Sequence, residues 1–253
     1  MMLRIAHTAW RFTPLLILAL FWEAIARLGL VSEYALPSFT AVVAAFIELA
    51  DTDLWTHTVL SLSRGGTALG LAIVFGVTVG VGMAWYRPVR IFINPVMQCL
   101  YPMPKSALIP LTIMWIGLGD ASKITLIFIG CLLPIVISSF NAARGTDEVL
   151  LWSARSLGAT EQEVLRQVVL PAALPEILNG IRTALALAFI LMVAGELIIS
   201  NNGVGYLIDV LGEGGSYAAM FSVVITISAV GFFADRLLVA VTRRILIWRE
   251  AQS

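Results

Sequence analysis

The sequence predicts an all-α integral membrane protein that folds as one helical bundle with six transmembrane helices. Its composition is the first observation behind this prediction. Hydrophobic residues make up 59% of the 253 residues, and Asp, Glu, Lys and Arg together only 13%, about half of the roughly 25% typical of soluble domains. A water-soluble fold of this length could not bury so much apolar surface. The formal net charge is zero, so the basic face that nucleic-acid binding requires is not expected.

The second observation is a set of long apolar stretches. A transmembrane helix takes about 20 mostly apolar residues, and six such stretches lie at 12–30, 59–85, 91–116, 124–140, 181–200 and 219–241. The connections between them are short, so we expect a single transmembrane domain over 1–253. The first stretch could instead be a signal peptide, because Arg4 and Arg11 precede it and Ala24-Ile25-Ala26 fits a cleavage site. Glu23 and Arg27 are spaced to pair on a helix that continues past that site, which favours a span.

Basic residues predict the orientation, because they are enriched in cytoplasmic segments of membrane proteins. With the N-terminus inside, the inner segments hold twelve of the sixteen Lys and Arg residues, whereas the outer segments 31–58 and 201–218 hold none. We therefore expect both termini in the cytoplasm. The twelve inner residues are Arg4, Arg11, Arg87, Arg90, Arg144, Arg155, Arg166, Arg182, Arg236, Arg243, Arg244 and Arg249.

Two smaller features lie in the first half of the chain. Pro37-Ser38 precedes a short predicted helix at 39–49, which either lies on the outer membrane surface or packs on the bundle. The second span is rich in glycine, and the pairs Gly66/Gly70 and Gly76/Gly80 have the spacing that lets helices approach closely. We therefore expect a glycine face on this span to pack against a neighbouring helix.

The third stretch, 91–116, is rich in proline. Proline lacks an amide donor and clashes with the preceding turn. Such backbone is tolerated in a membrane where it is buried in protein or lines a wet cavity. The stretch is therefore a candidate for a translocation route. Its prolines are Pro95, Pro102, Pro104 and Pro110, and its candidate lining residues are Met103, Met114 and Trp115.

Two charged residues in the apolar stretches raise the same question. A charge near the bilayer centre costs about 2.5–3.5 kcal/mol on insertion scales, so Lys105 should face the protein interior or an aqueous cleft. It could contact an anionic solute, extend to the membrane interface, or pair with an acidic residue. Glu196, near the outer end of the fifth span, could be a structural hydrogen-bond acceptor or a gate and substrate contact.

The segment 141–180, between the fourth and fifth spans, is long, polar and cytoplasmic. Thr146 can cap a helix whose first turn holds Asp147 and Glu148, and Gly158 is suited to ending that helix. The run from Thr160 to Glu163 fits a capping box that starts a second helix. Pro171 is expected to stop that helix, and Pro175 to open the fifth span. Such a rigid helical pair either binds a soluble partner or lies as an amphipathic hairpin on lipid headgroups.

This segment resembles the cytoplasmic loop of bacterial ABC importer permeases, which has the pattern E-A-A-x3-G-x9-I-x-L-P. The glycine-to-proline spacing matches that pattern, whereas Trp152 replaces the family glutamate, Ser153 the first alanine and Val168 the isoleucine. The resemblance implies a type I-like ABC importer permease fold, with 141–180 as the coupling loop. The implied ATPase-coupling residues are Trp152, Ser153, Ala154, Arg155, Gly158, Ala159, Leu170 and Pro171.

Other motifs resemble the branch of nitrate, sulfonate and taurine importers, and the resemblance covers about 36–248. The motifs lie at 36–38, 61–64, 115–124, 169–175 and 203–208. The resemblance implies a multi-pass protein of the bacterial cytoplasmic (inner) membrane that imports a small, anionic organic or inorganic solute. Its implied partners are two ABC ATPase subunits, a second permease copy in a homodimer and an extracytoplasmic solute-binding protein.

The chain has no G-x-x-x-x-G-K-[ST] phosphate-binding loop. We therefore expect that it is not an enzyme and binds no cofactor, with ATP and Mg held by the partner ATPase. Only two histidines occur, so neither a metal site nor a catalytic cluster is expected. The alternative function is an ion-driven secondary transporter, which usually shows internal repeats and carboxylates at the membrane midplane.

Overall fold

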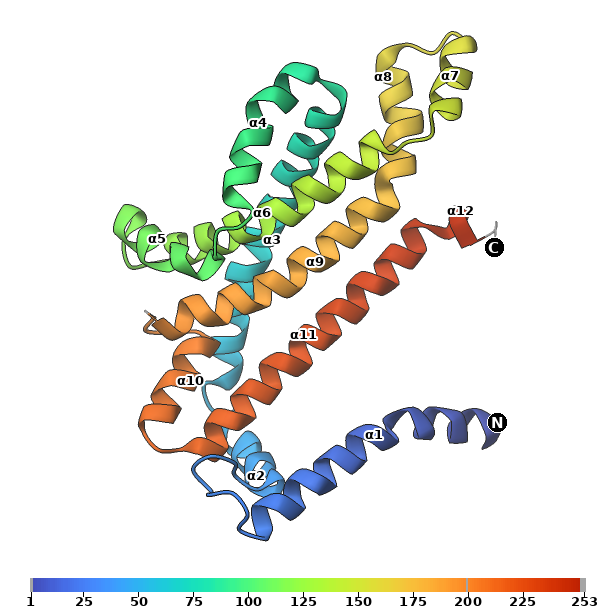
Figure 1. Ribbon diagram of the computed structural model, residues 1–253. Coiled ribbons are helices and arrows are strands. Elements are labelled where there is room, and N and C mark those ends of the chain that lie inside the picture. Colours follow the sequence, from blue (N-terminus) through green and yellow to red (C-terminus); the bar gives the residue numbers. More distant parts are fainter. Residues whose placement is uncertain (1, 199, 251–253) are drawn as a thin grey trace.

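The computed structural model describes the backbone of residues 2–198 and 200–250, and the side chains of residues 13, 14, 16–198 and 200–248. Within these residues the protein is built from helices without strands (Figure 1). In chain order they are α1 (Met2–Arg27), α2 (Phe39–Ala50), α3 (Leu54–Trp85), α4 (Arg87–Leu100), η1 (Lys105–Ala107), α5 (Leu108–Ile116), α6 (Asp120–Arg144), α7 (Glu148–Ser156), α8 (Glu161–Glu163), η2 (Val164–Val169), α9 (Leu170–Ile198), α10 (Val204–Glu213), α11 (Tyr217–Ile245) and α12 (Ile247–Glu250).

Four helical stretches of the described part are long and apolar enough to cross a membrane. They are Leu54–Trp85, Asp120–Arg144, Glu161–Ile198 and Tyr217–Ile245. These stretches contain the spans predicted at 59–85, 124–140 and 219–241, together with most of the span predicted at 181–200, whose residue 199 lies outside the described residues. The first predicted span, 12–30, is helical as far as Arg27 in α1.

The third predicted span is wrong as one continuous helix. Residues 91–116 divide between α4 and the pair η1 and α5, with a break at 101–104. Pro102 and Pro104 lie in this break, and neither can donate the amide hydrogen bond that would carry a helix through it. Figure 1 shows α4 running back beside α3 and α5 turning away from it.

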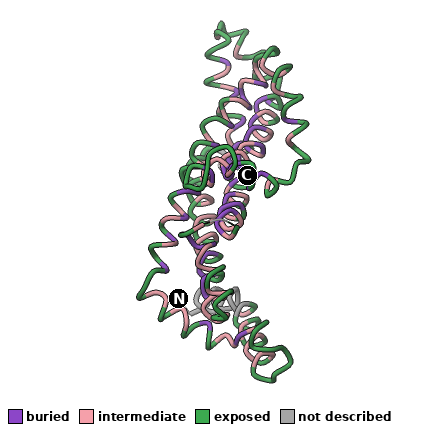
Figure 2. The backbone as a smooth tube through the Cα atoms, turned by 90° about the vertical axis from the view of Figure 1, so that its left-hand side faces the viewer, coloured by how far each residue is buried: buried purple, intermediate pink, exposed green. Residues whose placement is uncertain are grey.

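The core forms where α6 packs between α3 and α9, and Figure 2 shows buried residues running along the middle of the bundle. Close approach of α3 and α6 depends on two glycines. A Cβ at Gly76 would lie 2.7 Å from a side-chain carbon of Ile135, and one at Gly80 would lie 2.6 Å from Ser139. The predicted packing role is therefore confirmed for this pair of glycines. It is wrong for Gly66 and Gly70, where an added Cβ would meet no atom within 4 Å.

The short helix α2 packs on the bundle, against α11, as one of its two interpretations predicts. Ser38 caps it, because the Ser38 hydroxyl accepts the Ala41 N–H at 3.3 Å. The end of α1 is fixed nearby: the Trp22 indole donates to the Pro37 carbonyl at 2.8 Å. The predicted pairing of Glu23 with Arg27 is present at 2.6 Å.

The segment 141–180 forms the predicted helical pair, with three corrections. Gly158 ends α7 with a φ of +86°, and the capping box between Thr160 and Glu163 is present. The cap of α7 is Asp147, whose carboxylate accepts the Val149 N–H at 2.9 Å. Thr146, the predicted cap, is buried and donates its hydroxyl to a carbonyl of α6 instead.

Pro171 does not stop the second helix, which continues from Glu161 to Ile198 over 38 residues. Pro175, predicted to open the fifth span, therefore lies inside α9 rather than at its start. The helix continues because of the π-helical turn η2 just before Pro171, in which the Leu170 N–H reaches the Leu165 carbonyl, five residues back. Such a turn adjusts the hydrogen-bond register where proline cannot take part. At ~1.5 Å per residue the 38 residues span roughly 57 Å, against a hydrocarbon core of about 30 Å. The helix therefore extends well beyond the bilayer, with α7 at its tip (Figure 1).

Candidate functional site

The tip helix α7 has an apolar outer side. Four large side chains there are exposed: Val149 by 61%, Leu150 by 50%, Trp152 by 61% and Leu157 by 89%. The opposite side of α7, with Leu151 and Ala154, packs toward the core. We call the four exposed residues the α7 face. An exposed apolar patch of this kind is typical of an interaction site.

The other residues that the resemblance implies for ATPase coupling form the frame behind this face. Arg155 reaches across the Gly158 turn to Glu161, with 2.9 Å between Nε and the carboxylate. That hydrogen bond raises the pKa of the Arg155 guanidinium. The others differ in exposure: Ser153, Gly158 and Pro171 are exposed, and Ala154, Ala159 and Leu170 are half-buried.

The candidate lining residues lie on the broken third stretch. Met114 is 72% exposed, Trp115 63% and Met103 38%. Lys105 lies beside them and acts as a cap on α4. Its ammonium donates to the carbonyls of Leu100 at 2.7 Å, Met103 at 2.8 Å and Tyr101 at 3.2 Å. Three carbonyl partners match the three protons of an ammonium, and an anion would have to displace one of them.

A buried ion pair lies at the other end of the bundle from α7. Arg64 of α3 and Glu196 of α9 meet at 2.7 Å, and their side chains are 2% and 1% exposed. The Ser61 hydroxyl lies 2.6 and 2.8 Å from the two carboxylate oxygens of Glu196. It also accepts the Val204 N–H at 2.8 Å. Glu196 is thus enclosed in hydrogen bonds, as its structural interpretation predicts.

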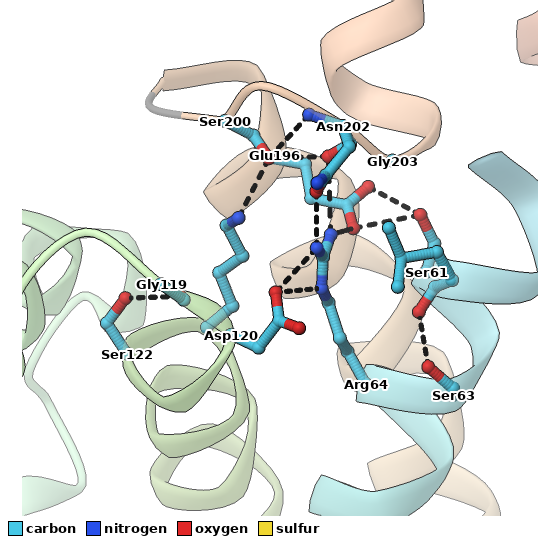
Figure 3. A network of polar contacts seen from close by, with 12 residues as sticks. Ser61, Ser63, Arg64, Gly119, Asp120, Ser122, Glu196, Ser200, Asn202 and Gly203 are labelled. Carbon is cyan, nitrogen blue, oxygen red and sulfur yellow. Dashed lines mark hydrogen bonds and ion pairs between the residues drawn. The ribbon is translucent and has the colours of Figure 1, made fainter.

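Arg64 extends this pair into a network across the ends of three long helices that lie opposite α7 (Figure 3). Its guanidinium binds Asp120 at the start of α6, with an N–O distance of 2.6 Å. It also donates to the side-chain oxygen and the backbone carbonyl of Asn202. We call Ser61, Arg64, Asp120, Glu196 and Asn202 the outer network. It joins α3, α6, α9 and the turn before α10. Within it, both oxygens of the buried Glu196 carboxylate have a hydrogen-bond donor.

The sequence pattern points to Glu196 but not to Arg64, Asp120 or Asn202. Arg64 and Asp120 each lie in a motif quoted above, at 61–64 and 115–124. Their contact joins positions 56 residues apart, and that of Arg64 with Glu196 joins positions 132 apart. No local pattern carries that information. The available signal was the rarity of a charge inside an apolar span, which applied to Arg64 as much as to Glu196.

The turn before α10 depends on Gly203. Its φ is +107°, its N–H donates to His57 Nδ1 at 2.8 Å, and an added Cβ would overlap the Glu196 carboxylate. We expect Gly203→Ala to lower the free energy of unfolding by at least about 2 kcal/mol, from strain and displacement of the carboxylate together. Thermal unfolding of the purified protein in detergent measures this loss.

Gly215→Ala is the matched control. Gly215 also has a positive φ, +73°, but an added Cβ there meets no atom within 4 Å. Backbone strain alone should cost about 1 kcal/mol. If the two variants lost the same free energy of unfolding, the overlap with Glu196 would add nothing to the cost of Gly203→Ala.

Comparison with known proteins identifies the class. The family "Binding-protein-dependent transport system inner membrane component" matches residues 72–247. The chain is 33% identical to the taurine transport system permease protein TauC of Escherichia coli (strain K12), covering 92% of this chain and 87% of that protein. It is 34% identical to the putative aliphatic sulfonates transport permease protein SsuC of Bacillus subtilis (strain 168), covering 94% and 86%.

Solved structures agree on the fold. The inward-facing MetNI methionine ABC transporter superposes with a TM-score of 0.65 at 20% identity, covering 76% of this chain and 96% of that chain. An amino acid ABC transporter crystallised with histidines gives a TM-score of 0.62 at 16% identity, covering 79% and 98%.

The chain therefore belongs to the family of inner membrane components of binding-protein-dependent transport systems. Within that family it is an ABC importer permease of the nitrate, sulfonate and taurine branch. It is a multi-pass membrane transport protein, not an enzyme.

Proposed function

We propose that this permease forms the membrane route for a small organic sulfonate, and that a separate pair of ABC ATPase subunits drives import through the α7 face. The substrate class rests on the relatives, which carry the names of taurine and aliphatic sulfonate permeases. A sulfonate keeps a full negative charge at neutral pH. The route must therefore offer hydrogen-bond donors at some point along its length.

The α7 face is the observation that carries the coupling proposal. It holds Trp152 and Leu157, exposed by 61% and 89%, on a short helix framed by an ion pair and a capping box. A partner that covers this face gains the burial of several large apolar side chains. The helix that begins at Glu161 is continuous from the α7 region into the bundle. A displacement of α7 is therefore transmitted along a helix rather than a loop.

Where the family pattern has a glutamate, this chain has Trp152. The ATPase surface that receives α7 should therefore offer an apolar pocket at this position rather than an arginine. The chain also lacks a phosphate-binding loop, so ATP and Mg belong to the ATPase. Binding of ATP can shift the bundle between its inward-open and outward-open states only by favouring one of them.

The orientation follows from charge and from the position of α7. The turn between α3 and α4, with Arg87 and Arg90, lies at the same end of the bundle as α7 (Figure 1). Basic residues favour the cytoplasmic side, so we assign that end to the cytoplasm, with both termini inside. An extracytoplasmic solute-binding protein would deliver the sulfonate to the opposite end, which carries the outer network.

A single copy offers half of a route. Met114 and Trp115 are exposed on α5, which turns away from its own bundle. We propose that a second, identical copy covers this side and that the route runs along the two-fold axis between the copies. Met103, Met114 and Trp115 would then face the route, whereas Lys105 holds the break at the end of α4.

Uptake of labelled taurine and ethanesulfonate into proteoliposomes tests the substrate class. The vesicles contain the permease with the ATPase and binding protein of the same importer. We expect both sulfonates to be taken up and each to compete with the other, and excess methionine not to compete. Uptake of neither sulfonate would overturn the proposed class.

A further inference from the structure

Four basic residues lie outside the set assigned to the cytoplasm, and two of them, Arg64 and Lys105, are fully engaged. Arg27 pairs with Glu23 at 2.6 Å. Arg64 is 2% exposed and binds two carboxylates and Asn202. Lys105 has three carbonyl partners for its three protons. Arg64 and Lys105 therefore have no donors to spare for a solute, whereas Arg27 uses two of its five N–H donors, on Glu23 and Thr40.

The fourth, Lys123, is different. Its side chain rises from the first turn of α6 and is half-buried. Its ammonium donates to one partner in the described structure, the Ser200 hydroxyl at 2.8 Å. No carboxylate of the described residues lies within ion-pair distance of it. An ammonium has three protons, so two of them have no acceptor within the part of the chain that the structure describes.

A second donor belongs to Asn202, two residues after Ser200. The Ser200 hydroxyl that receives Lys123 also donates to the Asn202 carbonyl at 2.5 Å. The side-chain oxygen of Asn202 faces Arg64, which can only donate. The side-chain NH2 of Asn202 is therefore turned away from Arg64, and it has no partner among the described residues. Among the described residues, Lys123 and Asn202 thus both have unused donors, and Ser200 is hydrogen-bonded to the Lys123 ammonium and to the Asn202 carbonyl.

We propose that Lys123 and Asn202 form an anion-contact site at the outer end of the route, which receives the sulfonate group of the solute. The proposal deepens the proposed function and rests on its substrate class. A sulfonate has three acceptor oxygens, so it can accept hydrogen bonds from an ammonium and an amide at the same time. Arg64 and Lys123 together balance Asp120 and Glu196, so the site has no net charge before the anion arrives. Binding of the anion to this site is therefore reversible, as transport along a route requires.

The test measures taurine uptake and ATP hydrolysis together in the complete reconstituted importer. We expect Lys123→Gln to lower the number of taurine molecules imported per ATP by about tenfold, since one charge-assisted contact is lost. ATP hydrolysis and thermal stability should stay close to those of the wild type. Lys123→Arg keeps the charge and should restore most of the ratio.

Asn202→Asp tests the anion contact while keeping the hydrogen bond that Asn202 accepts from Arg64. It retains the oxygen that Arg64 needs but replaces the NH2 donor by a carboxylate oxygen, so the import ratio should fall as for Lys123→Gln. An unchanged import ratio in both variants, or a joint fall of uptake, hydrolysis and melting temperature, overturns the inference. If the wild-type importer takes up neither taurine nor ethanesulfonate, the proposed substrate class fails, and this inference fails with it.

Discussion

Arg64→Leu should leave little folded protein, because Glu196 would remain in the core as a charge without its partner. Both side chains are almost wholly buried, at 2% and 1% exposure. Removal of one partner of a buried ion pair costs about 3–5 kcal/mol. Arg64 also connects α6 and the turn before α10 through Asp120 and Asn202. We expect a sharp loss of the monodisperse peak when the detergent-solubilised protein is heated, at temperatures that the wild type withstands.

The double variant Arg64→Leu, Glu196→Leu is the control. It removes both buried charges, and apolar replacement of a whole ion pair is often nearly neutral. The double variant should therefore be more stable than Arg64→Leu alone. Arg64→Lys keeps the charge but loses the planar fork, and should lie between the wild type and Arg64→Leu. If Arg64→Leu were as stable as the wild type, the outer network would not be holding the helices together.

Trp152→Asp should separate the permease from its ATPase while leaving its own fold intact. The side chain is 61% exposed, so little core packing is lost. A buried tryptophan at an interface commonly contributes about 2 kcal/mol or more, roughly thirtyfold in affinity. Aspartate replaces it with a charge that the apolar pocket of the partner would have to desolvate. Binding of the purified ATPase to the permease in nanodiscs measures the change.

Two further variants show whether the effect belongs to the α7 face. Trp152→Phe keeps an aromatic anchor and should retain most of the affinity. Trp248→Asp makes the same chemical change at a tryptophan that is 53% exposed on α12, outside the face. It should bind the ATPase as the wild type does. Equal affinity of wild type and Trp152→Asp would exclude this face as the docking surface.

Local chemistry predicted much of the fold. The spans follow from apolar stretches, and the start of α8 follows from Thr160 and Glu163, which contact each other three residues apart. Gly158 could be predicted because its positive φ is a local property. The errors came where two local rules compete. Pro171 ends most helices, but a π turn immediately before it lets this one continue.

The outer network was beyond local prediction, because its contacts join residues far apart in the chain. The role of Lys105 had the same limit. The sequence shows that Lys105 is a charge in an apolar stretch. It does not show that a helix ends just before Lys105 and that the carbonyls of that helix end accept hydrogen bonds from its ammonium. Lys105 and Lys123 differ in the number of hydrogen-bond partners of the ammonium, and only the structure shows that number.

The central claim is that a separate ATPase drives this permease through α7. Taurine uptake into proteoliposomes tests it most directly, with permease, ATPase and binding protein present and with ATP, ATPase or ion gradient omitted in turn. The account predicts that uptake stops without ATP or without the ATPase, stops with Trp152→Asp, and persists when proton and sodium gradients are collapsed. Uptake by the permease alone, driven by an ion gradient, would contradict it.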